Sequence, residues 1–221
     1  MAQTVFGAVK TTYFANLLLG IERGVALSYP ATQYWGLATC NKGPRSALNS
    51  VTLATNDYIC VIPTTGTRMQ LYKCTSGGQL AASQGSLYPG VPNESISDGG
   101  ATMVEQSSGL QGVTGASMAI LAEPTIGSNA YARLAITSNT TNWAAASGGS
   151  IANAGVAWAW PQATPAGWTS GLQAVWGIFS VDSASAGAGN IWQIAGLTAS
   201  FQVPALLTAS IAAGNFTLTE F

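Results

Sequence analysis

The acidic side chains are the first candidates for chemistry in this sequence, because the chain has no histidine to act as a general acid or base near neutral pH. Only Glu94, Asp98 and Glu105 lie close together among its eight Asp and Glu residues. Most glycoside hydrolases need a pair of carboxylates held about 5 to 10 Å apart on rigid elements. These three instead lie in a Gly- and Ser-rich run with Pro89 and Pro92, which is typical of an exposed loop. We therefore predict solvated turns and no catalytic residue here.

The common catalytic and nucleotide-binding motifs are absent from the sequence. GASMA at residues 115–119 lacks the second glycine of the nucleophile elbow GxSxG. GAGN at residues 187–190 lacks the third glycine of the dinucleotide fingerprint and any following cation. DSASAGAG at residues 182–189 offers one carboxylate, too few oxygen ligands for calcium, and predicts a hairpin turn. We expect the protein not to be an enzyme and to bind no cofactor or metal.

The three cysteines, Cys40, Cys60 and Cys74, allow at most one disulfide. Their spacing fits neither a CxxC redox pair nor a zinc knuckle, and no histidine is available to complete a zinc site. We expect reduced, semi-buried thiols, with a single bridge as the alternative.

Tryptophan side chains are the main candidates for contact surfaces. In AWAWP, Trp158 and Trp160 lie two residues apart and so on one side of a predicted strand, where they can pack in the core or on another subunit, or stack on a sugar. We expect Asn142 and Trp143 to form a turn whose ring packs back onto the sheet. The candidate packing or interface residues are Trp143, Trp158, Trp160, Trp168, Trp176 and Trp192.

The elements that position these residues are mostly predicted strands. Residues 11–19 show one helical stripe, with Thr11 or Thr12 as N-cap and Gly20 as the stop. Residues 32–40 predict a strand. Residues 41–115, with short strands and many turn signals, predict an insertion or subdomain within a single 1–221 domain.

The chain from residue 116 onward is more regular than the rest. Apolar runs compatible with strands alternate there with Gly- and Ser-rich turns. This pattern predicts an all-β fold, an antiparallel β-sandwich or jelly roll with a short N-terminal helix.

The low charge content of the chain limits the classes of partner that we expect it to bind. Charged residues make up 7% of the chain, the net charge is -1, and no Lys, Arg or His follows Arg133. Binding of nucleic acid through a basic groove is therefore not expected. A weakly charged surface favours association, so we expect a homo-oligomer, with dimer and trimer both open. No apolar run approaches the length of a membrane span, so no membrane association is expected.

Several motifs in order resemble one family. They are FANLLLGI at residues 14–21, QYWGLATC at 33–40, YARLAITSNTTNW at 131–143 and WTSGLQAVWGIFSVD at 168–182. The chain is similar to small tailed-bacteriophage virion structural proteins, often labelled tail fibre or minor structural proteins. The resemblance covers residues 5–40 and 127–221. Here the connection after residue 40 is much longer than in the family, and the acid that follows WGIF is displaced to Asp182.

The resemblance implies a structural virion component with a β-sandwich body and no catalysis, assembled in the host cytoplasm. We expect a capsid decoration (cement) protein that stabilises the head shell, with the major capsid protein as its partner. A tail fibre or tail-associated protein is the alternative, and a glycan-binding module of the virion is a further alternative.

Overall fold

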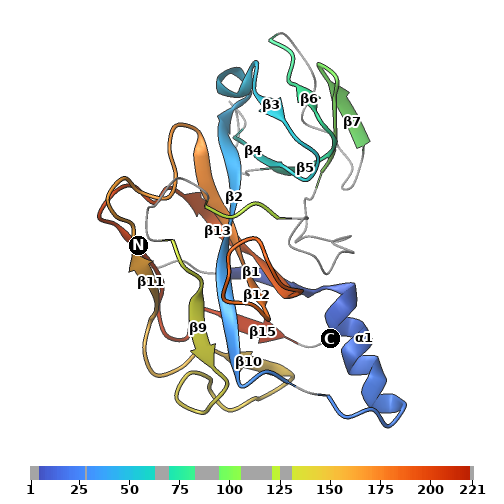
Figure 1. Cartoon of the computed structure of the whole chain (residues 1–221), viewed down its shortest axis with the longest axis vertical. Helices are drawn as coiled ribbons and strands as arrows, with labels where there is room; N and C mark the ends of the chain where they lie inside the picture. The colour runs from blue at the N-terminus through green and yellow to red at the C-terminus, as the bar shows by residue number, and fades with distance from the viewer. Residues whose placement is uncertain are drawn as a thin grey trace.

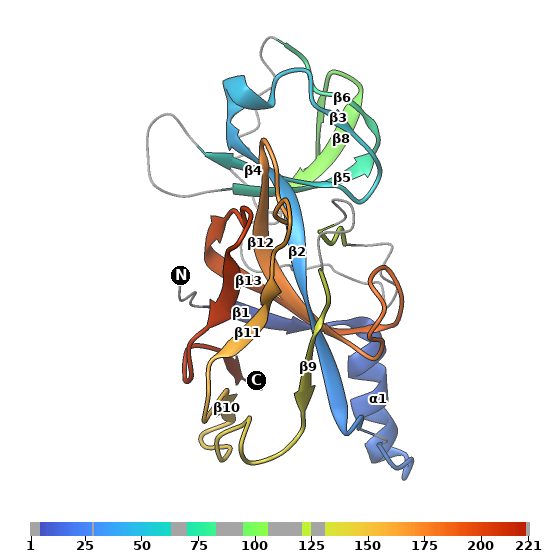
Figure 2. The ribbon, with the colours of Figure 1, turned by 60° about the vertical axis from the view of Figure 1, so that its left-hand side comes forward.

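The structure is a computed structural model that describes residues 5–27, 29–62, 70–82, 95–105, 121–124 and 131–219. Its described part is elongated, with a small upper lobe above a larger body (Figures 1 and 2). The upper lobe consists of the described residues between 45 and 105, and the body consists of the other described residues. One long strand, β2 (Thr32–Pro44), runs from the bottom of the body into the upper lobe.

A curled sheet of nine strands crosses both regions, in the order β1-β13-β12-β2-β4-β5-β8-β7, with β9 also paired to β2. Its other strands are β1 (Val5–Lys10), β4 (Tyr58–Ile62), β5 (Gln70–Ser76), β7 (Ser95–Asp98), β8 (Ala101–Glu105), β9 (Leu134–Thr137), β12 (Gln173–Val181) and β13 (Ile191–Phe201). The pairing of β2 with β4 is parallel, whereas the other pairings in this sheet are antiparallel.

Three two-stranded sheets complete the described strands. They pair β10 (Ser150–Ala152) with β15 (Thr217–Thr219), β11 (Trp158–Gln162) with β14 (Thr208–Ile211), and β3 (Thr52–Leu53) with β6 (Gly78–Gln79). A short 3-10 helix, η1 (Arg45–Leu48), follows β2. The predicted mostly-β fold with a short N-terminal helix is confirmed. The expectation of a wholly antiparallel arrangement is wrong, because β4 enters the sheet parallel to β2.

The N-terminal helix α1 (Thr12–Glu22) begins as the sequence indicates. Thr11 is the N-cap, and its Oγ1 accepts a hydrogen bond from the backbone N–H of Phe14 at 3.3 Å. The rings of Tyr13 and Phe14 lie 6.2 and 5.1 Å from the ring of Trp192 in β13, which fixes the start of the helix on the body.

The predicted end of the helix is wrong. The helix continues through Gly20 to Glu22, because a glycine inside a helix costs only about 1 kcal/mol relative to alanine. Gly24, with φ of 75°, adopts the left-handed conformation that ends a helix.

The body has a core built largely from aromatic rings. Side chains of β2, β12 and β13 on one face of the curled sheet pack against those of β11, β14 and β15. At its centre, the ring of Trp35 lies 5.2 Å from that of Trp158 and 4.8 Å from that of Phe216. Trp143 joins them, with its ring 5.0 Å from that of Trp158. Such aromatic pairs add stability beyond the burial of their surface.

The upper lobe has a smaller core of its own. Its buried residues are Leu48, Leu53, Ile59, Val61, Tyr72, Cys74, Leu80, Ala101 and Met103. The segment between residues 45 and 105 contains no tryptophan. The described parts of the predicted 41–115 insertion, apart from the end of β2, form this lobe.

A disulfide between Cys40 of β2 and Cys60 of β4 lies where the lobe joins the body. Their Cα atoms are 6.2 Å apart, an ordinary separation for a disulfide. The expectation of reduced thiols is therefore wrong for this pair, because strand pairing brings together two cysteines that lie 20 residues apart in sequence. Cys74 is free and buried, as expected for a reduced thiol.

Candidate functional site

The acidic cluster of the sequence does not form a site among the described residues. Asp98 and Glu105 lie toward opposite ends of the β7–β8 hairpin, since Asp98 pairs with Ala101 and Glu105 is four residues further along β8. At about 3.3 Å per residue, they are roughly 13 Å apart along the strand. Asp98 is buried, and its Oδ1 accepts a hydrogen bond from the backbone N–H of Ala81 at 3.1 Å. Glu94 lies outside the described residues.

All six candidate tryptophans have buried side chains. Trp143, Trp158, Trp160 and Trp168 belong to the body core, Trp176 lies at the junction with the lobe, and Trp192 lies under α1. Their exposed fractions range from 0% for Trp168 to 9% for Trp143. Trp158 and Trp160 do share one side of β11, but at 1% and 2% exposure neither ring is open to a sugar or to another subunit.

Two of these indoles are fixed by hydrogen bonds to β2. Trp160 Nε1 donates to the carbonyl of Trp35 at 2.9 Å, and Trp176 Nε1 donates to the carbonyl of Thr39 at 3.1 Å. The predicted turn at Asn142 also has the expected form. Asn139 Oδ1 accepts hydrogen bonds from the backbone N–H groups of Thr141 and Asn142, each at 3.0 Å, and the Trp143 ring packs back onto the sheet.

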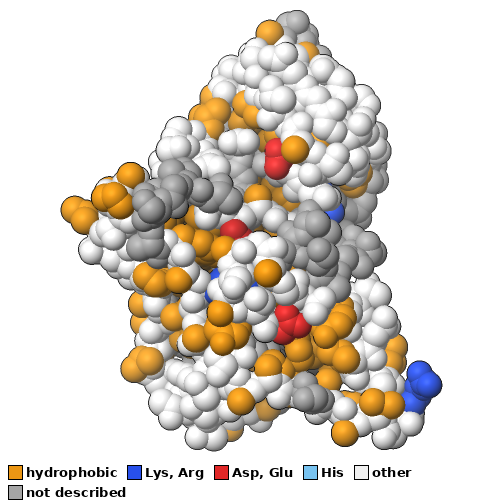
Figure 3. Space-filling view, in the orientation of Figure 1, with side chains coloured by type: hydrophobic (Ala, Val, Ile, Leu, Met, Phe, Trp, Pro, Cys, Tyr) orange, Lys and Arg blue, Asp and Glu red, His pale blue; other side chains and the backbone are white. Residues whose placement is uncertain are grey.

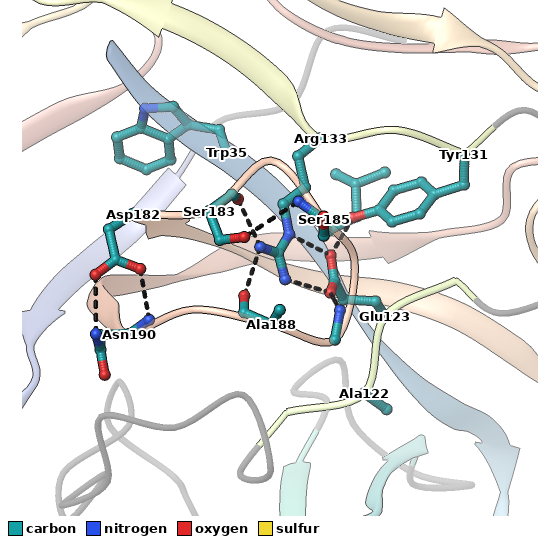
Figure 4. A network of polar contacts seen from close by, with 12 residues as sticks. Trp35, Ala122, Glu123, Tyr131, Arg133, Asp182, Ser183, Ser185, Ala188 and Asn190 are labelled. Atoms are coloured by element: carbon teal, nitrogen blue, oxygen red, sulfur yellow. Dashed lines mark hydrogen bonds and ion pairs between the residues drawn. The ribbon is translucent and has the colours of Figure 1, made fainter. Parts of the chain in front are cut away.

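The densest polar arrangement in the described structure is a buried ion pair between Arg133 and Glu123 (Figure 4). Arg133 Nη2 lies 2.6 Å from Glu123 Oε2, and Arg133 Nε donates to Glu123 Oε1 at 3.0 Å. Arg133 Nη1 donates to the carbonyls of Ser183 and Ala188 at 2.7 and 2.8 Å. The two side chains are 0% and 3% exposed. The bidentate geometry suits the planar guanidinium, and it holds the β12–β13 loop against the segment before β9.

Two further groups donate hydrogen bonds to the Glu123 carboxylate. Tyr131 Oη donates to Oε1 at 2.7 Å, and the backbone N–H of Gly187 donates to Oε2 at 2.7 Å. Tyr131 Oη also accepts a hydrogen bond from the backbone N–H of Leu37 in β2 at 3.0 Å. Burial, and secondly the Glu123 carboxylate, raise the pKa of Tyr131 well above its ordinary value. The phenol therefore remains a hydrogen-bond donor at neutral pH.

The packing under this ion pair depends on a glycine. The guanidinium carbon of Arg133 lies 5.5 Å from the centre of the Phe179 ring, which adds a cation–π contact. Gly36 of β2 faces the same ring, and a Cβ atom at that position would overlap it. A buried ion pair with its hydrogen bonds satisfied is costly to break but contributes modest net stability. Its position between a loop, a strand and a neighbouring segment indicates a role in fixing their arrangement.

One feature of the sequence points to this network. Arg133 is the last cation of the chain, and it lies next to an apolar strand. A buried arginine needs a partner, and the partner, Glu123, lies ten residues earlier. Because residues 125–130 separate the two, their encounter could not be deduced from strand alternation.

An open cleft of about 390 Å³ lies at the lower edge of the body. Tyr29 and Trp143 contribute aromatic surface, and Ile151 and Leu218 contribute aliphatic surface. The remaining lining residues are Ser138, Asn139, Thr140 and Ala144. The cleft is thus mainly apolar with a neutral polar rim, and none of the described residues that line it is charged.

Large hydrophobic side chains also remain exposed on the described surface. They are Leu19, Ile21, Val25, Tyr29, Val156 and Leu206. On the face shown in Figure 3, hydrophobic atoms are widespread and charged side chains are few and scattered. Low charge combined with exposed apolar side chains is the composition found in the core of protein–protein interfaces.

The described residues contain no group of three or more His, Cys, Asp or Glu placed to hold a metal ion. In the same ranges, no helix has the length and apolar character needed to cross a bilayer. No family model matches the chain, and neither a curated protein nor a solved structure matches it.

Proposed function

We propose that this protein is a structural component of a tailed-bacteriophage virion, a capsid decoration protein that binds the major capsid protein and stabilises the head shell. The observation that carries this proposal is a surface with very little charge on which large apolar side chains remain exposed. Such a surface can bind a protein lattice through apolar contact, with little dependence on salt. The sequence resemblance to virion structural proteins supports the same function.

Leu206 is the exposed residue that best fits a docking role. Its side chain is 68% exposed, and its φ of 65° lies in the left-handed region, which leucine rarely adopts. The backbone N–H of Leu206 donates to the carbonyl of Ala163 at 2.7 Å, which holds this conformation. A strained residue that gains no burial within its own chain is a candidate for burial against a partner.

The architecture of the body supports a finer proposal about the fold. The β10–β15 and β11–β14 sheets contribute to the same core as one face of the large curled sheet. We propose that these elements form an irregular β-sandwich, which is the body that the resemblance implies. The rigid aromatic core suits a protein that must keep its shape on a particle surface.

The experiment that tests the function is binding of the purified protein to particles that lack it, measured by sedimentation in low salt and in about 1 M NaCl, where screening acts within about 3 Å. We expect binding to persist in high salt and the copy number per particle, from quantitative mass spectrometry, to scale with capsid subunits. Release in high salt, or no binding to heads, would contradict the proposal.

A matched variant separates docking from folding. Leu206→Asn places a residue that tolerates the left-handed conformation at the same position. We expect it to weaken particle binding at least tenfold while the free energy of unfolding is unchanged or slightly higher. Leu206→Met, which keeps an apolar side chain, should bind as the natural protein does.

The alternatives predict different results. A tail fibre or tail component would be present in few copies, and antibody would label one end of the virion. For a glycan-binding module based on Trp158, Trp158→Ala would lose glycan binding but remain folded. Burial predicts instead that Trp158→Ala loses about 3–5 kcal/mol of stability, measured by urea denaturation.

A further inference from the structure

The open cleft at the lower edge of the body has the size and the lining of a small-ligand site. Its volume of about 390 Å³ falls within the range of about 300–1,000 Å³ that such sites occupy. Tyr29, Trp143, Ile151 and Leu218 give it apolar surface, and the turn at residues 138–140 gives it polar groups. A mainly apolar lining with a few polar groups that orient the ligand is the usual composition of a binding site.

The polar groups of the turn are partly fixed and partly free. Asn139 Oδ1 accepts hydrogen bonds from the backbone N–H groups of Thr141 and Asn142, each at 3.0 Å. These two donors identify the oxygen of the amide and hold the side chain in place. Asn139 Nδ2 and the hydroxyl of Thr140 have no hydrogen-bond partner within the described structure, and both side chains are exposed. The turn therefore presents an oriented amide donor and a hydroxyl to the cleft.

Trp143 adds a donor from a side chain that is almost completely buried. Its exposed fraction is 9%, its ring packs on those of Trp35 and Trp158, and it lines the cleft. Its indole N–H has no hydrogen-bond acceptor among the described residues. The unpaired indole nitrogens of Trp35 and Trp158 are fully buried, whereas Trp143 Nε1 is not. An acceptor atom of a ligand can therefore pair with this donor, which otherwise depends on water.

The lining disfavours both charged ligands and wholly apolar ligands. None of the described lining residues is charged, so a phosphate, a carboxylate or an ammonium group would lose water without gaining a counter-charge. A hydrocarbon would leave the Asn139 amide and the Trp143 indole N–H without partners. The ligand that fits must combine a C–H surface with neutral hydroxyl or amide groups.

An extended peptide has such a mixture, but the turn offers it little backbone to bind. Peptides that add as a strand pair with free backbone groups at the edge of a sheet. Here the backbone N–H of Ser138 donates to the carbonyl of Ala31 at 2.9 Å, and the carbonyl of Asn139 accepts from the N–H of Trp143 at 3.1 Å. The free groups on the rim thus belong to side chains, which favours a saccharide over a peptide.

Tyr29 supplies an exposed ring on which a sugar can pack. Its side chain is 43% exposed, yet two contacts hold it in place. Its ring lies edge to face with that of Trp192 at 5.4 Å, and Gln33 Nε2 donates a hydrogen bond to its hydroxyl. Because the ring is already ordered, little side-chain entropy is lost when a ligand packs on it.

We propose that this cleft is a binding site for a neutral saccharide. The C–H face of one sugar ring packs on Tyr29, and the sugar hydroxyl groups bond to Asn139, Thr140 and the indole N–H of Trp143. The site does not involve the buried Trp158. This inference goes beyond the capsid function and does not depend on it.

The test applies the purified full-length chain, without particles, to an array of glycans. The neutral members are oligosaccharides of glucose, galactose, mannose and N-acetylglucosamine, and the acidic members are sialylated and sulfated. We expect neutral members to bind, and titration calorimetry with the same oligosaccharides free in solution to give dissociation constants of about 1 mM or lower. Preference for the acidic members would overturn the proposal.

Variants of the lining connect the binding to this cleft. Tyr29→Ala should raise the dissociation constant roughly tenfold or more, whereas Tyr29→Phe, which keeps the ring, should raise it much less. Asn139→Asp keeps the oxygen that holds the turn but replaces the amide donor with a charge, so it should also weaken binding roughly tenfold or more.

A control variant and a stability measurement exclude unfolding as the cause. Val156→Thr changes a side chain that is 63% exposed and is not among the lining residues, and it should leave the dissociation constant unchanged. Urea denaturation should show that each variant remains folded. The proposal is overturned if no neutral oligosaccharide binds at about 10 mM, a generous bound for a specific site, or if Tyr29→Ala and Asn139→Asp leave binding unchanged. Particle binding is measured separately, so neither result decides the capsid function.

Discussion

The body and the upper lobe differ in the side chains that fill their cores and in the links that stabilise them. The core of the body consists largely of packed aromatic rings, and the Arg133–Glu123 ion pair holds the β12–β13 loop against it. The lobe has a small core of mostly aliphatic side chains, and a disulfide ties its β4 to the body strand β2. A small core buries little apolar surface per residue, so a covalent link contributes proportionately more there.

The two regions therefore need not have equal stability, although one sheet runs through both. Each region also contains a side chain whose signal reports its unfolding. The lobe segment contains no tryptophan, so tryptophan fluorescence follows the body and, through Trp176, its junction with the lobe. Cys74, the single free cysteine, is buried in the lobe, so its reaction with a thiol reagent follows opening of the lobe.

The largest effect is expected from breaking the ion pair of the body. Glu123→Gln leaves the Arg133 charge buried without its counter-charge, and we expect a loss of about 3–5 kcal/mol in the free energy of unfolding followed by tryptophan fluorescence in urea. The rate of Cys74 labelling under native conditions should change little. Equal acceleration of Cys74 labelling would mean that body and lobe open as one unit.

An exposed acid on the same loop provides the control. Asp182 accepts hydrogen bonds from the backbone N–H and the side-chain amide of Asn190, at 2.7 and 2.9 Å. Asp182→Asn should cost about 1 kcal/mol or less, because an exposed hydrogen bond is readily replaced by water.

A smaller effect, in the other region, is expected from removing the disulfide. Replacing both Cys40 and Cys60 by alanine should lower the free energy of unfolding by about 3 kcal/mol, the value for a closed loop of this size. The lobe should respond first, so Cys74 labelling should accelerate more than the fluorescence transition shifts. Titration of thiols in denaturant should find one thiol in the natural chain without reductant and three with it. Three thiols without reductant would contradict the bridge.

The smallest effect is expected at alkaline pH. Tyr131 in the body and Tyr58 in the lobe both have raised pKa values because of burial. Unfolded tyrosines lose their protons near pH 10, whereas these two keep theirs to higher pH. The free energy of unfolding should therefore be independent of these groups below about pH 9, and each should lower it by about 1.4 kcal/mol per pH unit above pH 10.

Single variants separate the two contributions in urea denaturation between pH 9 and 11. Tyr131→Phe should flatten the pH dependence of the fluorescence transition. Tyr58→Phe should flatten it to the same extent only if the lobe unfolds together with the body. No change in slope for Tyr131→Phe would contradict the burial of that phenol as a neutral donor.

The sequence determined the local features of this protein. Apolar runs between Gly- and Ser-rich turns identified β9, β11, β12 and β13, because a strand that packs in a core needs apolar residues over its whole length. Thr11 or Thr12 marked the start of α1, and Asn142 with Trp143 marked a turn, since both depend on bonds between near neighbours in the chain. The low charge of the surface was also fixed by composition alone.

Tertiary structure decided which distant residues meet. The parallel pairing of β2 with β4 brought Cys40 to Cys60, and the packing of segment 121–124 beside β2 brought Glu123 to Arg133. Burial of Trp158 on both sides, and exposure of Leu19 at the end of α1, likewise depend on what other elements cover. Local patterns report which side of an element is apolar, but only the assembled chain determines what lies against that side.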